Sequence, residues 1–466
     1  MVKIKESFKI NKRRTQKTKG VRGKNKLKEL FKYIKTGIKE KGLIKFGKEF
    51  LFENKTTQQT IMKNTFWLFL AEISNKILLF LTTVLIANIL GALKYGQFNF
   101  AISFATLFSV LIDFGLSTYS IREIAKNKFF LNNNLITITQ IKLILSATAV
   151  ILGSGIYFII GYPIELFAFV LLAFTWTIIQ NFSEYVLYIS QGLEKMHFVA
   201  IGKILYATLL IGSIAAITTI NSTINFIFLS YIAASLITLV IIAYLVLKKT
   251  NFSNTLLEFK QTYELIKESW PFALSILVNA LYTYIDISIL ALFVSFDLIG
   301  IYSVSVKILL LLYALGGILA SASFPAISRI TKTSKSQVKK LINKTIIINI
   351  GISIFAIIIS LLMDKIIFQI IGSEFSQSYV PFRILLISLP FLYTRLIFGN
   401  YLKASNNQLK YFGIILLGAI INISLNFLLI PNFSYLGAAI ATTLSEIAVF
   451  SISTITYFKL INQRNT

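Results

Sequence analysis

Residues 65–90 read TFWLFLAEISNKILLFLTTVLIANIL, and residues 98–119 read FNFAISFATLFSVLIDFGLSTY. Each run is long enough to cross a bilayer, because about 20 apolar residues with a rise of ~1.5 Å per residue span a hydrocarbon core of ~30 Å. Residues 91–96 leave room only for a short turn, so the sequence predicts a transmembrane hairpin. A charge at the bilayer centre costs about 2.5–3.5 kcal/mol. We therefore expect the charged side chains of the hairpin to face protein or water; they are Glu72, Lys76 and Asp113.

The rest of the chain repeats this pattern of apolar runs. Hydrophobic residues make up 56% of the 466 residues and charged residues only 14%, a composition too apolar for a soluble protein. Further runs follow at 135–160, 166–189, 204–220, 226–247, 272–293, 302–323, 346–363, 384–398, 412–429 and 436–458. The predicted fold is an all-α integral membrane protein with twelve transmembrane helices, preceded by a basic amphipathic segment.

Basic residues predict how the chain is oriented in the membrane. Residues 1–63 hold 20 of the 46 Lys and Arg residues, and beyond them basic connections alternate with connections that carry few charges. Because basic loops stay on the cytoplasmic side, we expect a multi-pass protein of the plasma membrane with both termini in the cytoplasm. Apolar residues recur at helical spacing among the lysines of 27–50, which predicts an interfacial helix on anionic lipid. Lipid headgroups suffice to explain these lysines, so no nucleic-acid partner is expected.

The two halves of the chain are predicted to be parallel repeats. Six spans in the first half return the chain to its starting side, so the second half enters the membrane in the same sense. The turn at Gly91 and Gly96 has a counterpart around Gly300, with Tyr95 and Tyr302 in matching positions. The predicted organisation is a tail at 1–63, a first six-helix lobe at 64–249, an amphipathic cytoplasmic linker at 250–269 and a second six-helix lobe at 270–466.

Proline and glycine mark candidate hinges. Pro390 lies inside the tenth predicted span and should kink it. Together with Gly316 and Gly317 in the eighth span, it is a candidate hinge for motion between the lobes; a static kink that only improves packing is the alternative. The other prolines are expected at or near helix ends, where a missing N–H does least harm: Pro163, Pro271, Pro325, Pro381 and Pro431.

Several short motifs follow one another in a fixed order. They are Leu90-Gly91 with Tyr95-Gly96, Asp113-Phe114-Gly115, Arg122-Glu123, Phe324-Pro325-Ala326, Gly372-Ser373-Glu374-Phe375 and Gly437-Ala438-Ala439. Over about residues 64–458 they resemble the Wzx-type oligosaccharide flippases, in the polysaccharide-biosynthesis branch of the multidrug/oligosaccharidyl-lipid/polysaccharide exporter superfamily. The resemblance implies a transporter that moves lipid-linked oligosaccharide or polysaccharide repeat units from the cytoplasmic to the outer leaflet by alternating access, with a proton or sodium gradient as the candidate driving force.

A lipid-linked substrate of this kind carries a diphosphate, which cationic side chains inside the membrane would bind. The candidates are Lys76, Lys307 and Arg395. Helix rise places Lys76 ~18 Å above the inner boundary and Lys307 ~12 Å below the outer one, which in a ~30 Å core is the same height. We therefore predict that these two lysines face one cavity from opposite lobes. Carboxylates in the spans are candidate coupling or cavity groups: Glu72, Asp113, Asp286 and Glu446.

Each candidate cation also has a plainer interpretation. Glu72 and Lys76 have the i, i+4 spacing of a favourable helical ion pair. Lys307 could pair with Asp286 or Glu446, which would leave the cavity neutral. The two interpretations differ in whether a carboxylate lies within ion-pair distance of each lysine.

Charges near the cytoplasmic ends of spans need no functional role. Lys142 and Lys203 are expected to extend to the headgroups, because a long side chain can keep its charge in water while its stem stays in lipid. Asp113 could cap the turn that precedes Arg122. These interpretations stand beside the cavity roles.

Other function classes fit the sequence less well. The chain has no cysteine and one histidine, so neither a Cys-ligated nor a His-cluster metal site is expected, and no cofactor is implied. A membrane glycosyltransferase or polymerase would need outer loops with acidic residues and arginines, whereas the predicted outer loops are short and hold few charges. We therefore expect no enzyme. A MATE-like cation or drug antiporter of the same superfamily is the alternative transporter, but cations within the spans favour an anionic substrate.

Overall fold

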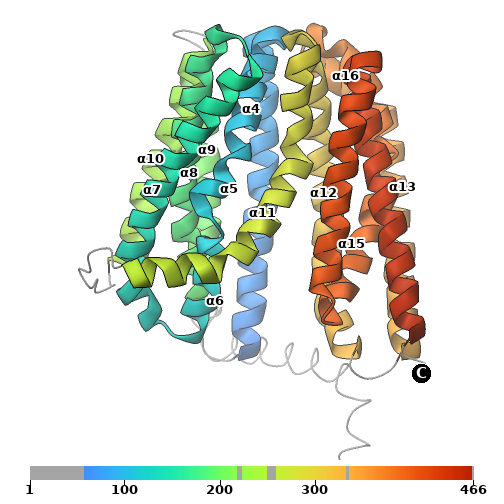
Figure 1. Ribbon diagram of the computed structural model, residues 1–466. Coiled ribbons are helices and arrows are strands. Elements are labelled where there is room, and N and C mark those ends of the chain that lie inside the picture. The colour runs from blue at the N-terminus through green and yellow to red at the C-terminus, as the bar shows by residue number, and fades with distance from the viewer. Residues whose placement is uncertain (1–56, 218–222, 249–258, 332–334, 464–466) are drawn as a thin grey trace, which may run out of the picture. The chain divides into compact units, whose positions relative to one another are not determined.

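The computed structural model describes residues 57–217, 223–248, 259–331 and 335–463, which form helices joined by short connections (Figure 1). The first half contains α4 (Thr57–Leu107), α5 (Ser109–Asp113), α6 (Leu116–Lys126), α7 (Phe129–Ile160), η1 (Ile164–Leu166), α8 (Phe167–Gly192), α9 (Met196–Ile217) and α10 (Ile224–Leu247). The second half contains α11 (Phe259–Phe293), α12 (Phe296–Thr331), α13 (Lys335–Ile371), η2 (Ser373–Ser378), α14 (Tyr379–Leu386), α15 (Leu389–Ala404) and α16 (Gln408–Gln463). The predicted interfacial helix of the tail and residues 250–258 of the predicted linker lie outside the described residues. Residues 68–466 form one compact unit.

Two of the helices are interrupted by a single residue with a left-handed φ. Gly91 (φ 68°, ψ 173°) breaks α4, and Ser434 (φ 55°, ψ −143°) breaks α16. Glycine adopts a positive φ without steric cost because it lacks a Cβ. The predicted hairpin is therefore formed, but its turn is shorter than the predicted 91–96, since the chain is already helical again at Ala92.

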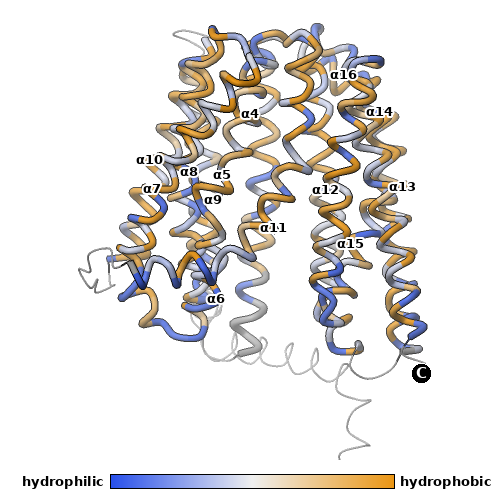
Figure 2. Tube along the Cα trace, in the orientation of Figure 1, coloured by the Kyte–Doolittle hydropathy of each residue, from blue (hydrophilic) through white to orange (hydrophobic). Residues whose placement is uncertain are grey.

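The described helices have the length and composition of membrane spans. Nine of them are long and apolar enough to cross a membrane, and α14 with α15, which meet at a bend of 43°, would make a tenth. Figure 2 shows hydrophobic residues along most of each helix and hydrophilic ones mainly toward the ends. On α13, Ile347 and Leu362 are 71% and 76% exposed, a surface that only lipid would cover favourably. The chain is a multi-pass membrane protein.

The expectation that these prolines lie at or near helix ends is wrong at two positions, since Pro271 lies inside α11 and Pro325 inside α12. Pro431 lies three residues before the break in α16 at Ser434, near the end of a span as expected. Pro271 is internal because the end of the predicted linker and the following span form one continuous helix, α11. A proline inside a helix can bend it without ending it. Figure 1 shows the first turns of α11 lying across the other helices before α11 turns to run along them.

Apolar packing joins the two halves mainly at one end of the unit, and at the other end α11 alone packs Leu265 against the first half. A shared cluster brings Tyr95 and Phe100 of α4 together with Ile299 and Tyr302 of α12. Two further clusters each belong mainly to one half, around Leu116, Ile138 and Ile242 in the first half and around Val338, Tyr401 and Tyr457 in the second. The halves are therefore held together near the break in α4 and have separate cores toward the other end.

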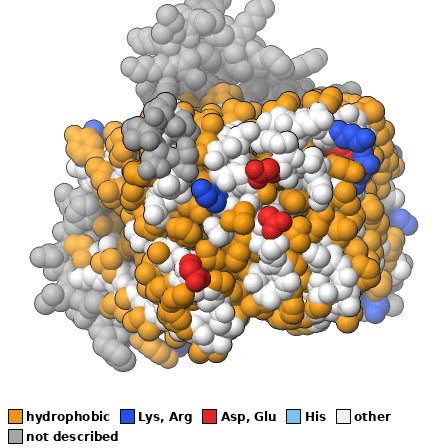
Figure 3. Space-filling view, turned by 90° about the horizontal axis from the view of Figure 1, so that it is seen from above, with side chains coloured by type: hydrophobic (Ala, Val, Ile, Leu, Met, Phe, Trp, Pro, Cys, Tyr) orange, Lys and Arg blue, Asp and Glu red, His pale blue; other side chains and the backbone are white. Residues whose placement is uncertain are grey.

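The shared end is closed by matching glycines. A Cβ on Gly96 would lie 1.7 Å from the backbone oxygen of Phe296. A Cβ on Gly300 would lie 2.1 Å from the backbone oxygen of Ala92. A carboxylate completes the contact, because the Ala92 N–H donates to Glu374 Oε2 at 2.7 Å. Figure 3 views the protein from this end, where few charged side chains lie among hydrophobic and uncharged ones.

Candidate functional site

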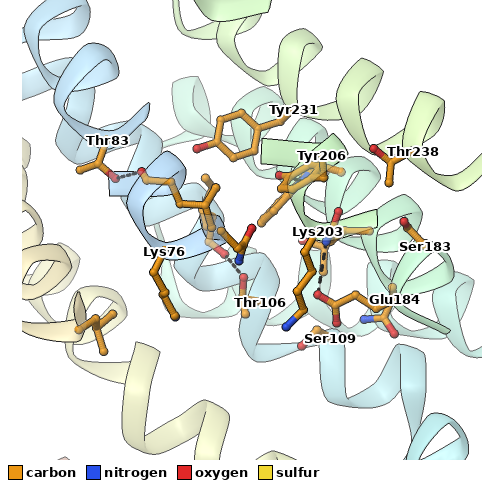
Figure 4. A pocket seen from close by; sticks show the side chains of 18 of the residues that line it. Lys76, Thr83, Thr106, Ser109, Ser183, Glu184, Lys203, Tyr206, Tyr231 and Thr238 are labelled. Carbon is orange, nitrogen blue, oxygen red and sulfur yellow. Dashed lines mark hydrogen bonds between the residues drawn. The ribbon is translucent and has the colours of Figure 1, made fainter. Parts of the chain in front are cut away.

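A cavity of about 520 Å³ lies between the two halves within residues 68–466. One side of it is formed by α4 and α12, and the other by α8, α9 and α10. Figure 4 shows Lys76 on the first side and Tyr206, Tyr231 and Glu184 on the second. Its lining is rich in polar side chains, among them Asn75, Lys76, Thr83, Thr106, Thr177, Gln180, Asn181, Glu184, Lys203 and Lys307.

The structure brings Lys76 and Lys307 into the lining of this one cavity, as the height of each residue in the membrane predicts. Each half supplies one of them, Lys76 from α4 and Lys307 from α12. Among the described residues no acidic side chain lies within ion-pair distance of either lysine. Two uncompensated cations in a low-dielectric region are unfavourable, so the cavity is suited to an anion that contacts both.

The plainer pairing of Lys76 is not formed. Glu72 is bonded to Lys203 of α9, although Lys76 has the favourable spacing on the same helix. Lys203 in turn lines the cavity and does not extend to the headgroups, so that expectation is wrong. The ion pair joins α4 to α9 and satisfies both charges inside the membrane.

Arg395 and Glu446 satisfy each other in the second half. Arg395 Nε donates to Glu446 Oε2 at 2.6 Å and its Nη2 donates to Glu446 Oε1 at 2.9 Å, a two-point contact. Tyr282 also donates to Glu446 Oε1, at 2.9 Å, and Glu446 is fully buried. Arg395 is not among the residues that line the cavity, so the structure does not bring it together with Lys76 and Lys307.

Asp113 and Lys142 form a second buried pair, in the first half. Lys142 is 0% exposed and donates from Nζ to Asp113 Oδ1 at 2.7 Å and to Asn181 Oδ1 at 3.3 Å. Ser117, in the first turn of α6, donates to the same carboxylate oxygen of Asp113. The expectation that Lys142 extends to the headgroups is therefore wrong. Asp113 links α5, α6 and α7 where the second span ends.

We expect Lys142→Met to lower the free energy of unfolding by about 3–5 kcal/mol, because it leaves the Asp113 carboxylate buried without its counter-charge. Thermal unfolding of the purified protein in detergent measures the change. The matched control is Lys126→Met, since Lys126 is 60% exposed and pairs with Glu123 at the surface, where an ion pair contributes only ~0–1 kcal/mol. Adding Asp113→Leu to Lys142→Met should recover part of the loss. Equal, small effects of the two single changes would contradict the prediction.

Asp286 lies in the core of the second half and not in the cavity. Tyr302 donates to its Oδ2 at 2.8 Å and Thr442 donates to the same atom at 3.1 Å. Its other oxygen, Oδ1, is buried and has no hydrogen-bond partner among the described residues. A buried carboxylate oxygen without a donor is costly unless a proton or a cation joins it.

The candidate hinge residues differ in their surroundings. The chain bends by 43° between α14 and α15, and Pro390 lies in the first turn of α15, so the predicted kink is present. Gly316 and Gly317 lie inside α12, which continues as one helix past them. Gly316 packs against the ring of Tyr393, where a Cβ would come within 2.4 Å, whereas Gly317 faces open space. Whether any of the three acts as a hinge stays a prediction.

Comparison with known proteins identifies the family. The model of the polysaccharide biosynthesis protein family matches residues 61–331, more than half of the chain. The chain belongs to this family. The resemblance drawn from the motifs is thereby confirmed, and the matched residues contain both lysines of the cavity.

Relatives of this family member come from bacteria and archaea. The capsular polysaccharide biosynthesis protein CapF of Staphylococcus aureus is 25% identical over 200 residues, which cover 42% of this chain and 50% of CapF. The probable flippase AglR of Haloferax volcanii is 31% identical over 169 residues, 35% of each chain. The chain thus spans half or less of the length of these curated relatives.

A solved structure shares the fold of this family member. The lipid II flippase MurJ in its inward closed conformation superimposes with a TM-score of 0.69 over 83% of this chain and 86% of MurJ. The two sequences are 16% identical, so the likeness concerns the arrangement of helices. Both proteins have the fold of the multidrug/oligosaccharidyl-lipid/polysaccharide exporter superfamily.

One wall of the cavity was not predicted from the sequence. Trp176, Gln180 and Glu184 recur at intervals of four along α8, so they lie on one face of that helix, and they line the cavity beside Tyr206 and Tyr231. A polar stripe within an apolar run is the signal that would have found them, because Gln and Glu in a membrane span face the protein interior or a water-filled cavity.

Proposed function

We propose that this family member is a flippase, a transporter and not an enzyme, which moves lipid-linked oligosaccharide or polysaccharide repeat units from the cytoplasmic to the outer leaflet by alternating access. The observation that carries the proposal is the placement of Lys76 and Lys307 in one cavity between the halves, where neither has an acidic partner among the described residues. A diphosphate can contact both ammonium groups at once, while the lipid tail stays in the bilayer. The family and the names of its relatives support the same function.

The proposed architecture is twelve transmembrane helices in two six-helix lobes. Counting the interrupted α4 and α16 as two spans each, and the bent α14 and α15 as one, supports that number. The matching positions of Gly96 and Gly300, each packed against the turn of the other half, support parallel repeats. In this proposal the tail at 1–63 lies on anionic lipid, and both termini are cytoplasmic in the plasma membrane.

We predict the side of each loop from its charge. In a chain that has no cysteine, single cysteines at Lys126, Lys195 and Lys403 should be protected from an impermeant thiol reagent in intact cells. Cysteines at Lys94 and Lys365 should be labelled. Labelling of two or more of the first group would overturn the orientation.

Ion coupling belongs to the same proposal. Asp286 is the candidate group, because its Oδ1 is buried without a donor and a proton or a sodium ion would satisfy it. Asp286→Asn keeps the shape and removes the charge. It should make transport independent of the proton or sodium gradient and slower; a variant with an unchanged gradient dependence would exclude Asp286 as the coupling group.

Transport in reconstituted vesicles tests the function. A short-chain prenyl diphosphate linked to an oligosaccharide is placed in both leaflets, and an impermeant pyrophosphatase outside cleaves only the probe that reaches the outer leaflet. We expect the protein to make the whole probe pool cleavable, whereas protein-free vesicles should leave the inner half intact. Equal results with and without protein would refute the flippase. Export of a cationic drug in place of the probe would favour the MATE-like antiporter, although two lysines in the cavity would repel a cation.

A further inference from the structure

The cavity has two chemically different walls. Lys76 and Lys307 form a cationic wall on α4 and α12, whereas the wall on α8, α9 and α10 holds aromatic, amide and carboxylate side chains together with Lys203, whose charge is paired with Glu72. Figure 4 shows Tyr206, Tyr231 and Glu184 on this second wall, across the cavity from Lys76. A diphosphate needs only the first wall. Phosphate binding alone therefore gives the second wall no function.

The aromatic part of this wall is held in a fixed geometry. The indole N–H of Trp176 donates to the Tyr206 hydroxyl at 3.2 Å. The rings of Trp176 and Tyr231 meet edge to face, with centroids 5.3 Å apart at 84°. All three side chains line the cavity, so flat apolar surface is exposed inside a polar space. Such a surface fits the C–H face of a sugar ring, since it removes apolar area from water without requiring a charge.

The polar part of the wall is oriented by a chain of hydrogen bonds. Ser235 donates to Gln180 Oε1 at 3.1 Å, and Gln180 Nε2 donates to Glu184 Oε1 at 3.3 Å. Lys203 lines the same cavity but is bonded to Glu72, and among the described residues no ion pair of Glu184 is formed. Because Glu184 lines the cavity, its carboxylate can accept hydrogen bonds from a molecule bound there. An ionised carboxylate accepts hydrogen bonds only, and adjacent sugar hydroxyls are donors that match it.

We propose that Trp176, Tyr231, Gln180 and Glu184 form the subsite for the sugar next to the diphosphate, and that Glu184 selects an uncharged sugar there and rejects a uronic acid. This inference rests on the proposed flippase function and adds the chemical class of the first sugar. A volume of about 520 Å³ is in the range of a site for one small ligand, so it holds the diphosphate with its first sugars and not a long glycan. A uronate at this position would place two carboxylates side by side.

Two probes that differ only in the first sugar test the subsite. They are prenyl diphosphates carrying glucose or glucuronic acid, followed in vesicles by cleavage with an impermeant pyrophosphatase. We expect the unmodified protein to flip the glucose probe at least about tenfold faster than the glucuronate probe, because like charges in the site cost at least ~1.4 kcal/mol. Glu184→Gln keeps the size and removes the charge. It should bring the two rates to within about threefold of each other, mainly by accelerating the glucuronate probe.

Controls separate this subsite from the function on which it rests. Glu194→Gln removes a carboxylate from an exposed loop and should leave the ratio unchanged. Trp176→Leu should slow both probes by a similar factor. If Glu184→Gln does not insert, Glu184→Asp, which keeps the charge one methylene farther back, should retain the preference for glucose. Equal rates for both probes in the unmodified protein, or an unchanged ratio in Glu184→Gln, would overturn the subsite alone. Failure to flip either probe would overturn the function and the subsite together.

Discussion

Lys76→Ala and Lys307→Ala should each lower export of the surface glycan by more than about 30-fold while the protein is inserted at its normal level. Both lysines line the cavity, and no acidic side chain of the described residues pairs with either. Removing one cation leaves part of a desolvated diphosphate without its counter-charge, which costs about 2–5 kcal/mol. Complementation of a strain that lacks the protein, read out as surface glycan, measures the effect.

The pair also connects substrate binding to motion. Lys76 belongs to the first half and Lys307 to the second, so the two cations repel when the cavity is empty and a bridging diphosphate removes that repulsion. Binding therefore favours the arrangement in which the halves approach each other around the cavity. Lys307→Arg keeps the charge and should retain part of the activity. Lys94→Ala is the matched control, since Lys94 is exposed on the same helix and does not line the cavity.

Removing Glu72 together with Lys76 distinguishes the two roles of Lys76. If Lys76 only balanced a carboxylate, the double change would restore export. The structure gives Glu72 a different partner, Lys203, so we expect the double variant to stay inactive. Restored export would show that the substrate role of Lys76 is wrong.

The sequence predicted which residues lie in the membrane but not which charges pair there. The hairpin, the approximate spans and the common cavity of Lys76 and Lys307 follow from chain geometry, because rise per residue and hydrophobic length are properties of the backbone. Ion pairing depends on which helices touch. Glu72 binds a lysine 131 positions away and Arg395 binds a carboxylate 51 positions away, contacts that local spacing cannot predict.

The aromatic and polar wall was missed for a related reason. Taken singly, none of the residues Trp176, Gln180 and Glu184 indicates a binding site in the sequence. Their shared helix face becomes a cavity wall only because α8 packs against α9 and α10. Periodicity alone predicts that such residues share a helix face, but not which neighbour that face meets. The prolines inside α11 and α12 illustrate the same limit, since composition does not tell whether a helix is bent or ended.

Alanine at Gly96 or Gly300 should open the end of the protein that the two halves share. In the structure a Cβ at these positions would lie 1.7 Å from the Phe296 backbone oxygen or 2.1 Å from the Ala92 backbone oxygen. The obstructing atoms are backbone, so rotation of a side chain cannot relieve the clash. Overpacking of this kind costs about 1–3 kcal/mol, which shifts an equilibrium between closed and open forms by about 5- to 150-fold.

A cysteine in the cavity reports which form is populated. Thr83 lines the cavity, and the chain has no cysteine of its own, so Thr83→Cys is a unique site. In the proposed orientation this end faces outward. We therefore expect an impermeant thiol reagent added to intact cells to label Thr83→Cys much faster when Gly96→Ala or Gly300→Ala is also present. Glycan export should fall at the same time, because a protein that cannot close this end cannot complete an alternating-access cycle.

Glycines with space around them supply the control. A Cβ at Gly155 or Gly212 would meet no atom within 4 Å, and both lie within helices of the first half. Alanine at either position should leave labelling of Thr83→Cys and glycan export unchanged. That result would show that glycines in these spans are not generally sensitive to substitution. Slow labelling and normal export in Gly96→Ala and Gly300→Ala would mean that the halves do not need backbone contact to close. In that case the shared apolar cluster and cross-half hydrogen bonds, such as the one from Ala92 to Glu374, would hold this end shut.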